Sequence, residues 1–147
     1  MTPDDVGIIS VVSIAGHIIA VVSQSQRFYY IRPGEVTIDP LDFAEAESEP
    51  DEIIEALRVG DLVWLVGQSS TEAWYPSGDD VDVFLPSKGQ AFSRGAIEGT
   101  PVVVKDQVVL VGNDGIVYRI GGGIERISTN GIEEQIRVAL RQERENG

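Results

Sequence analysis

Few residue types in this chain could act as nucleophiles or bind a transition metal. His17 is the only histidine and there is no cysteine, which excludes thiol nucleophiles and thiolate zinc sites. A Ser–His–Asp triad would have to use His17, and no serine lies in the sharp strand-to-helix turn that exposes such a nucleophile. We therefore predict no catalytic residues of this class, and we expect His17 to be an exposed turn residue at the start of a hairpin.

Carboxylates, by contrast, are abundant, with 24 Asp and Glu residues. Clustered carboxylates with backbone oxygens suit Ca²⁺, and the best cluster is Asp79, Asp80 and Asp82. The cluster lacks the spacing of an EF-hand, so we expect an acidic hairpin loop and leave calcium binding open. A carboxylate pair could also hydrolyse glycosides, which makes a glycoside hydrolase the least favoured hypothesis. The glycines at 121–123 lack the lysine and helix of a phosphate loop, and no cofactor is predicted.

The charge of the chain bears on its partners. A formal net charge of −13 argues against direct duplex nucleic acid binding, because such a surface repels phosphate. Nine acidic residues and no basic one lie between Glu35 and Glu55, whereas five of the eleven basic residues lie from Arg119 onward. This asymmetry could steer head-to-tail contact between copies. Two oppositely charged, solvated faces are the simpler interpretation.

The chain lacks the sequence features of a membrane or secreted protein. No apolar run approaches the ~20 residues of a membrane-spanning helix, so no membrane insertion is expected. Residues 1–5 are acidic where a secretory signal is basic. These features predict a protein made and kept in a cytoplasm.

Three stretches share one pattern: a short apolar strand, a small polar turn and a second strand rich in aromatic or β-branched residues. This pattern predicts β-hairpins. The hairpins start about 44 and 46 residues apart, which is the spacing of blades in a β-propeller. Their Val, Ile and Leu runs indicate burial on both faces, as in sheets that stack on one another. The stretches are 16–31, 60–75 and 106–120.

Candidate outer strands flank each hairpin. They precede the hairpins at 7–12, 53–58 and 101–105 and follow them at 36–38, 81–85 and 124–127. A β-sandwich would also have many evenly spaced strands but would not explain the repeat. We therefore predict an all-β fold of about three four-stranded antiparallel, β-propeller-like blades, at about 7–38, 53–85 and 101–127.

Two segments fall outside the repeat. Residues 39–51 form a long acidic connection, which we expect to be an ordered loop or a helical turn. Near the C-terminus, Asn130 as a cap and Glu133 reaching back to it predict the start of a short helix over about 131–142. Its apolar face holds Ile132, Ile136, Ala139 and Leu140.

Three short motifs, within 39–51, 67–78 and 127–133, give the chain a family resemblance. In this order they resemble the "FA-AE--PD", "G--STE-WY-SG" and "IST--IE" segments of phage packaged-DNA stabilisation proteins, the tail-hub proteins of lambdoid short-tailed phages. The resemblance covers about residues 36–140. The motif residues, which we expect to be structural, are Phe43, Glu47, Pro50, Asp51, Ser70, Thr71, Glu72, Trp74, Tyr75, Gly78, Ile127, Ser128, Thr129, Ile132 and Glu133.

The resemblance implies a virion structural protein rather than an enzyme, found in the virion tail and, before assembly, in the host cytoplasm. It implies a ring that helps to retain packaged DNA, with the phage portal or adaptor above it and the needle or tailspike below. Family members are several times longer than three blades, so the chain resembles a fragment, a domain or a reduced relative. We expect its open blade faces to be covered by self-association, in a ring or a dimer, or by the rest of a longer propeller.

The second motif also makes a physical prediction. Strand alternation puts Glu72 and Trp74 on one face. A buried unpaired carboxylate is costly, so a buried Glu72 must have a partner, which we expect to be a backbone or hydroxyl donor. An exposed Glu72 is equally compatible with the sequence. The main alternative function is a carbohydrate- or cell-surface-binding propeller module, whose exposed aromatic rings would be Trp64, Trp74, Tyr75 and Tyr118.

Overall fold

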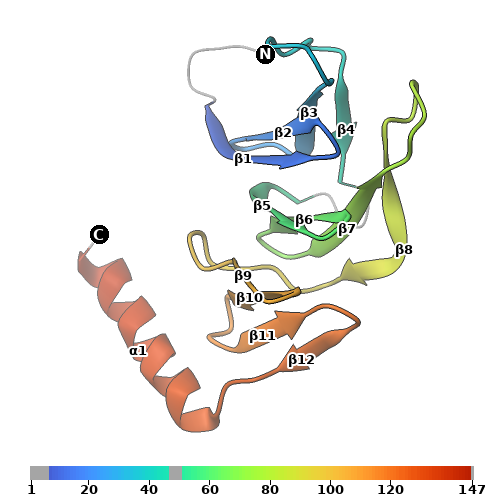
Figure 1. Cartoon of the computed structure of the whole chain (residues 1–147). Coiled ribbons are helices and arrows are strands. Elements are labelled where there is room, and N and C mark those ends of the chain that lie inside the picture. The colour runs from blue at the N-terminus through green and yellow to red at the C-terminus, as the bar shows by residue number, and fades with distance from the viewer. Residues whose placement is uncertain (1–6, 47–50, 147) are drawn as a thin grey trace.

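Three four-stranded antiparallel sheets stack in chain order, and one helix follows the last, in the residues that the structure describes, 7–46 and 51–146 (Figure 1). The structure is a computed structural model. Each sheet is built from four consecutive strands, each hydrogen-bonded to the next, which is the arrangement of a propeller blade. The prediction of an all-β fold of blade repeats is therefore confirmed.

The strand bounds define the blades. The first blade consists of β1 (Ile8–Ile14), β2 (His17–Val22), β3 (Arg27–Ile31) and β4 (Phe43–Glu45). The second consists of β5 (Ile53–Val59), β6 (Leu62–Gly67), β7 (Thr71–Pro76) and β8 (Phe84–Phe92). The third consists of β9 (Val102–Val104), β10 (Gln107–Val111), β11 (Val117–Ile120) and β12 (Ile124–Arg126), and it precedes the helix α1 (Asn130–Asn146).

The central hairpins lie where the sequence predicts them, but two outer strands do not. The fourth strand of the first blade, expected at 36–38, is β4, so this blade extends beyond residue 38. Val36 is 91% exposed in the loop before it. In the second blade, β8 begins at Phe84 rather than at residue 81 and continues past residue 85. Backbone pairing decides both positions, because β4 pairs with β3 through Phe43 and Tyr29, and β8 pairs with β7.

The β1–β2 turn shows how the tight connections form. Ala15 and Gly16 both have positive φ, of 51° and 79°, as a type I′ turn requires. The turn places His17 opposite Ile14 at the start of β2. His17 is half-buried, and its ring meets that of Phe84 edge-on with the centroids 5.3 Å apart. The prediction of an exposed turn residue at position 17 is therefore wrong.

The middle blade takes part in two separate cores, because its central strands are buried on both faces. In β6, Val63 and Leu65 belong to the core shared with the first blade. Their neighbours Trp64 and Val66 belong to the core shared with the third blade. This is the alternation of a β-strand, whose successive side chains point to opposite faces. The stack is therefore held together by apolar packing between successive sheets.

The C-terminal helix α1 begins as predicted but ends at Asn146 rather than near residue 142. Its capping differs from the prediction. The Thr129 hydroxyl oxygen, rather than Asn130, accepts a hydrogen bond from the backbone N–H of Ile132 at 3.4 Å. Glu133 directs its carboxylate toward Arg126 and not back to the helix start. Among the described residues, no helix has the length and apolar character needed to cross a bilayer.

Candidate functional site

The structure brings the end of the first motif against the start of the second. Asp51 Oδ2 accepts hydrogen bonds from the backbone N–H groups of Ser69 and Ser70, at 2.8 and 2.9 Å. The Ser70 hydroxyl donates to the same oxygen at 3.1 Å. Gly67 leaves room for this carboxylate, because a Cβ there would lie 2.1 Å from Asp51 Oδ2. Three donors on one charged acceptor fix the β6–β7 turn to the segment that enters β5.

Further along the second motif, Thr71 and Glu72 are buried in β7. The Thr71 hydroxyl donates to the backbone carbonyl of Arg94 at 2.7 Å, which ties β7 to the segment between β8 and β9. Glu72 is only 4% exposed, and Trp74 Nε1 donates to its Oε1 at 2.9 Å. This partner is an indole N–H, a donor that the sequence did not suggest.

The third motif surrounds Glu133, which is 2% exposed. Arg126 donates to both carboxylate oxygens, from Nε at 2.7 Å and from a terminal guanidinium nitrogen. The Ser128 hydroxyl also donates to Glu133 and accepts the backbone N–H of Val117 at 3.0 Å. The hydrogen bonds from Arg126 and then Ser128 hold the pKa of Glu133 below its ordinary value. This cluster joins β11, β12 and the first turn of α1.

The lowered pKa of Glu133 predicts a pH-dependent contribution to stability. A carboxyl group whose pKa is lower in the folded than in the unfolded state stabilises the fold fully when the pH is above its unfolded-state pKa. This stabilisation is lost as the pH falls through the folded-state pKa. We expect Glu133→Gln to lower the free energy of unfolding most at pH 7, and the difference from the wild type to shrink below pH 4.5, the ordinary glutamate value. Urea unfolding between pH 7 and pH 3 measures this.

The matched control for this prediction is Glu134→Gln. Glu134 is the next residue of α1, and its side chain is 61% exposed in a surface ion pair with Arg137. Exposed pairs of this kind contribute little to stability. A destabilisation by Glu133→Gln that stays constant from pH 7 to pH 3 would contradict the role given to the carboxylate charge.

The remaining motif residues do not gather at one place. Glu47 and Pro50 lie outside the described residues. Phe43 is half-buried in β4, and the Arg27 guanidinium lies 4.3 Å from the centroid of its ring. The exposed members of the set are Tyr75, Gly78, Ile127, Thr129 and Ile132. The motif residues therefore form two hydrogen-bonded clusters, the Glu72–Trp74 pair and several separate positions.

The acidic loop at 77–82 is organised by its own hydrogen bonds. Asp79 Oδ1 accepts the backbone N–H groups of Val81 and Asp82, at 2.6 and 3.0 Å. These two hydrogen bonds lower the pKa of Asp79. The Ser77 hydroxyl donates to the Asp82 carbonyl across the loop. Within residues 7–46 and 51–146, no three acidic, cysteine or histidine side chains are grouped so as to hold a metal ion.

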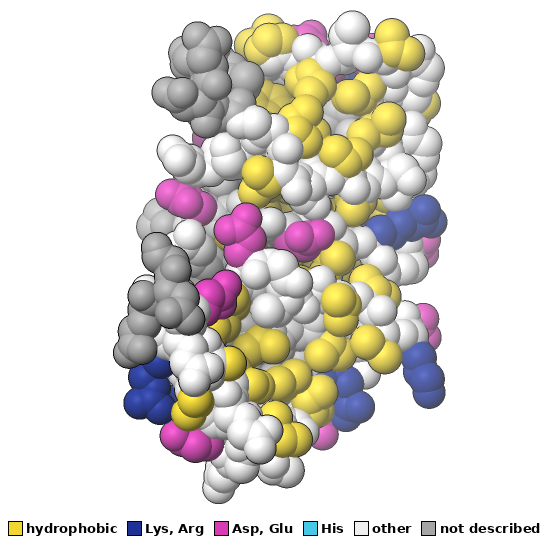
Figure 2. All heavy atoms as spheres, turned by 90° about the vertical axis from the view of Figure 1, so that its left-hand side faces the viewer, with side chains coloured by type: hydrophobic (Ala, Val, Ile, Leu, Met, Phe, Trp, Pro, Cys, Tyr) yellow, Lys and Arg dark blue, Asp and Glu magenta, His cyan; other side chains and the backbone are white. Residues whose placement is uncertain are grey.

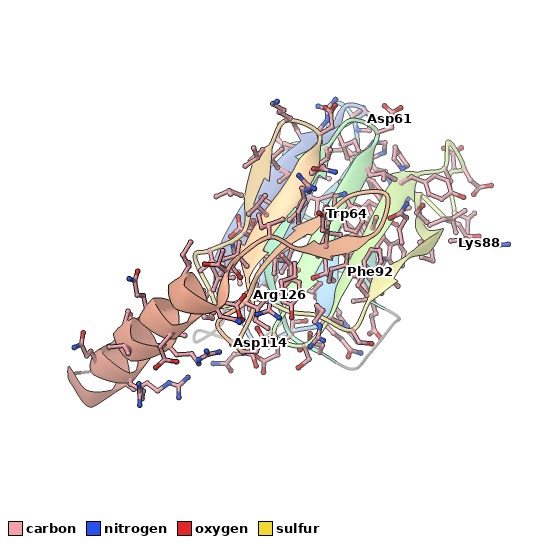
Figure 3. All side chains as sticks on the ribbon, turned by 90° about the horizontal axis from the view of Figure 1, so that it is seen from below. Asp61, Trp64, Lys88, Phe92, Asp114 and Arg126 are labelled. Carbon is pink, nitrogen blue, oxygen red and sulfur yellow. The ribbon has the colours of Figure 1, made fainter. Side chains whose placement is uncertain are left out.

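Most of the aromatic rings considered for sugar binding are packed inside the protein. Trp64, Trp74 and Tyr118 are 2%, 3% and 7% exposed, whereas Tyr75 is 37% exposed. The Trp64 ring stacks on that of Phe92, with the centroids 6.2 Å apart (Figure 3). Three of these four rings are therefore packed within and between blades.

A comparison with known protein families matches residues 1–145 to the family described as "Bacteriophage P22 Gp10, beta-propeller", a packaged-DNA stabilisation family. The chain belongs to the P22 Gp10 family. This membership confirms the resemblance carried by the three motifs, and it places the chain among phage structural proteins. The β-propeller in the family description agrees with the stacked four-stranded sheets. No curated protein matches the chain.

Two residues with a clear structural role in this P22 Gp10 family member were not predicted as site residues. Arg126 is the main partner of Glu133, and only its place just before the third motif could have suggested it. Gly95 lies against the β6–β7 turn, where a Cβ would lie 2.1 Å from the backbone carbon of Gln68. Sequence spacing gives no signal for that approach, because it joins separate segments of the chain.

Proposed function

We propose that this P22 Gp10 family chain is a structural module of a phage tail hub and acts through protein–protein contacts in a ring. The observation that supports this most is the direction of three motif carboxylates, of which Glu72 and Glu133 are buried. Asp51 binds the β6–β7 turn, Glu72 binds Trp74, and Glu133 binds Arg126. Their charge is used to fix turns and strand ends of the blades, which is the behaviour of a scaffold rather than of a catalytic site.

The packing of the aromatic rings favours the same proposal over a sugar-binding module. Sugar recognition by stacking needs accessible ring faces, and Trp64 and Trp74 bury theirs between sheets. Buried aromatic rings make a large contribution to stability through the area they remove from water. We infer that these residues hold the blades together.

Within the virion, we propose that the chain lies in the tail below the portal and enters it from the host cytoplasm during assembly. The proposed neighbours are the portal or adaptor above and the needle or tailspike below. The net charge of −13 opposes contact with the phosphate backbone. We therefore propose that the ring retains DNA by closing its exit route and not by binding the duplex.

A phage whose gene for this chain carries an early stop codon tests the proposal. We expect heads to package DNA normally and then to lose it, so that nuclease-resistant DNA falls while the yield of heads is unchanged. Supplying the wild-type chain from a plasmid restores filled particles. Nuclease protection and electron microscopy of purified heads measure both outcomes.

Filled, infectious particles made without this chain would contradict the proposed function. A failure of packaging itself, with no DNA entering the heads, would place the chain at an earlier step and would also contradict it. Leu41→Ala, at a loop side chain that is 82% exposed, is the control for the plasmid-borne copy and should restore filling fully.

A further inference from the structure

A cavity of about 470 Å³ lies between the second and third blades. Val59, Leu62 and Trp64 line it from the second blade, and the β9–β10 and β11–β12 turns line it from the third. Ligand sites in proteins have volumes of roughly 300–1,000 Å³. The walls of the cavity belong to residues 59–122, so both sheets that bound it are present. A further blade would add at an end of the stack and not here.

The corresponding position between the first and second blades is filled by the chain itself. Val59 and Leu62 are the equivalents of Ile14 and His17, because each pair closes the first hairpin of its blade. The His17 ring meets that of Phe84, which is 4% exposed. Ile14 is 2% exposed, whereas Val59 and Leu62 are only half-buried. An aromatic side chain therefore closes the first junction, and the second junction stays open.

The second junction stays open because the outer turn of the third blade is short. In the second blade, residues 77–83 lead from β7 to Phe84 at the start of β8, whereas three glycines, 121–123, join β11 to β12. Gly122 lines the cavity, its φ is not positive, and no atom of the described residues lies within 4 Å of the place of a Cβ. Neither its conformation nor its neighbours require a glycine. Bare backbone at a cavity permits the close approach of a ligand.

Two amide side chains line the cavity from opposite blades, Gln90 from β8 and Gln107 from β10. Gln90 Oε1 is buried and has no hydrogen-bond partner within the described parts of the chain. An unpaired buried acceptor is costly, and rotation of this half-buried amide can present either polar atom to the cavity. The two charged lining residues, Lys105 and Asp106, have opposite signs. The cavity therefore suits a neutral ligand with N–H and C=O groups.

Exposure of apolar side chains does not by itself select this cavity. Hydrophobic side chains are visible elsewhere on the surface, including over the first blade (Figure 2). The difference between two equivalent junctions does select it, because one is closed by Phe84 and the other by a glycine turn beside an unpaired amide. Trp64 offers no ring face to a sugar, since it is 2% exposed and stacked on Phe92.

We propose that this cavity binds an extended segment of another virion protein, which inserts an aromatic side chain beside Val59 and Leu62. The ring takes the place that Phe84 has in the first junction, and backbone groups of the segment form hydrogen bonds with Gln90 and Gln107. An anchor in a pocket and main-chain hydrogen bonds are the two parts of many peptide-recognition sites. The inference rests on the proposed structural role and specifies where a partner is held.

Capped tripeptides test the proposal on the 147-residue chain. The phenylalanine tripeptide acetyl-Gly-Phe-Gly-amide should bind saturably and shift the NMR signals of the Trp64 indole N–H and of the Gln90 and Gln107 side-chain amides. The tripeptide with alanine in the middle should bind at least roughly tenfold more weakly, because it lacks the apolar area of the ring.

Two neighbouring glycines provide a variant and its matched control. Gly122→Leu fills the cavity and should abolish the shifts caused by the phenylalanine tripeptide. Gly123→Leu adds the same side chain outside the cavity lining, again with no described atom within 4 Å of the Cβ position, and should bind like the wild type. Circular dichroism of both variants confirms that they are folded.

Gln90→Leu separates binding from stability. It removes the unpaired acceptor, so it should keep or raise the urea midpoint while it weakens binding of the phenylalanine tripeptide. A lower midpoint with unchanged binding would show that Gln90 serves the fold and would contradict its role in the cavity.

A wild-type chain without saturable shifts would overturn this inference, as would equal binding by the wild type and Gly122→Leu. Saturable binding of glucose in place of the tripeptide would assign the cavity to a sugar and overturn it as well. None of these results touches the proposed function, whose test is DNA retention in particles. A chain that is required for DNA retention and binds no tripeptide would separate the two.

Discussion

Replacing Phe28 by alanine is expected to lower the free energy of unfolding by about 3–5 kcal/mol. The side chain is fully buried, and its ring lies 5.1 Å from that of Trp74 and 6.1 Å from that of Phe84, centroid to centroid. Both neighbours belong to the second blade, so the substitution leaves a cavity at the contact between the first two sheets. Urea unfolding followed by tryptophan fluorescence measures the loss, because Trp74 lies beside the substituted ring.

Leu41→Ala provides the control for this cavity. It also shortens an apolar side chain, but one that is 82% exposed in a loop, and it should change stability by less than about 0.5 kcal/mol. A loss below about 1 kcal/mol for Phe28→Ala would contradict the packing of the first blade on the second.

Replacing Asp51 by alanine is expected to destabilise the chain by about 2–3 kcal/mol. The substitution removes one acceptor from three donors, and two of them belong to Ser70, which is 5% exposed. The N–H and hydroxyl of Ser70 would then be buried without this partner, which costs more than the loss of a solvated hydrogen bond. Urea midpoints give the change, and amide hydrogen exchange at Ser69 and Ser70 locates it.

Two variants separate the hydrogen bonds of Asp51 from its charge. Asp51→Asn keeps an acceptor oxygen of the same size and should lose less than Asp51→Ala. Asp61→Ala removes a carboxylate from the exposed β5–β6 turn and should be close to neutral. Equal stabilities for the wild type and Asp51→Ala would show that the turn does not depend on this carboxylate.

The hairpins could be predicted from the sequence because their signal is local. Apolar runs such as β6 and the polar turns beside them specify the strand, its neighbour and burial on both faces. The outer strands could not be placed as well. Residues 36–38 have the composition of a strand and lie in an exposed loop, whereas the three-residue β4 lies in an acidic stretch with no strand signal. Its position depends on pairing with β3, which is a tertiary effect.

In the candidate site, too, some features have a local sequence signal and others depend on tertiary contacts. Strand alternation placed Glu72 and Trp74 on one face, but the partner expected for Glu72 was a backbone or hydroxyl donor and not the Trp74 indole N–H. The contact of Asp51 with Ser70 could not be anticipated, since it joins positions 19 residues apart in sequence. The helix start was misassigned for a related reason. Glu133 fits a capping box from its spacing, but an arginine on β12 competes for the carboxylate and forms the stronger, charge-assisted hydrogen bonds.

The unequal number of neighbours in the stack has a thermodynamic consequence. The middle sheet has a packed partner on each side, whereas the first and third sheets have one each among the described elements. In a linear array with nearest-neighbour coupling, the terminal units open first and the central unit is protected longest. Seating a further sheet on an end would turn a terminal unit into an internal one. Any assembly through the ends would therefore suppress the early opening of the terminal sheets. It would also make the melting temperature rise with protein concentration.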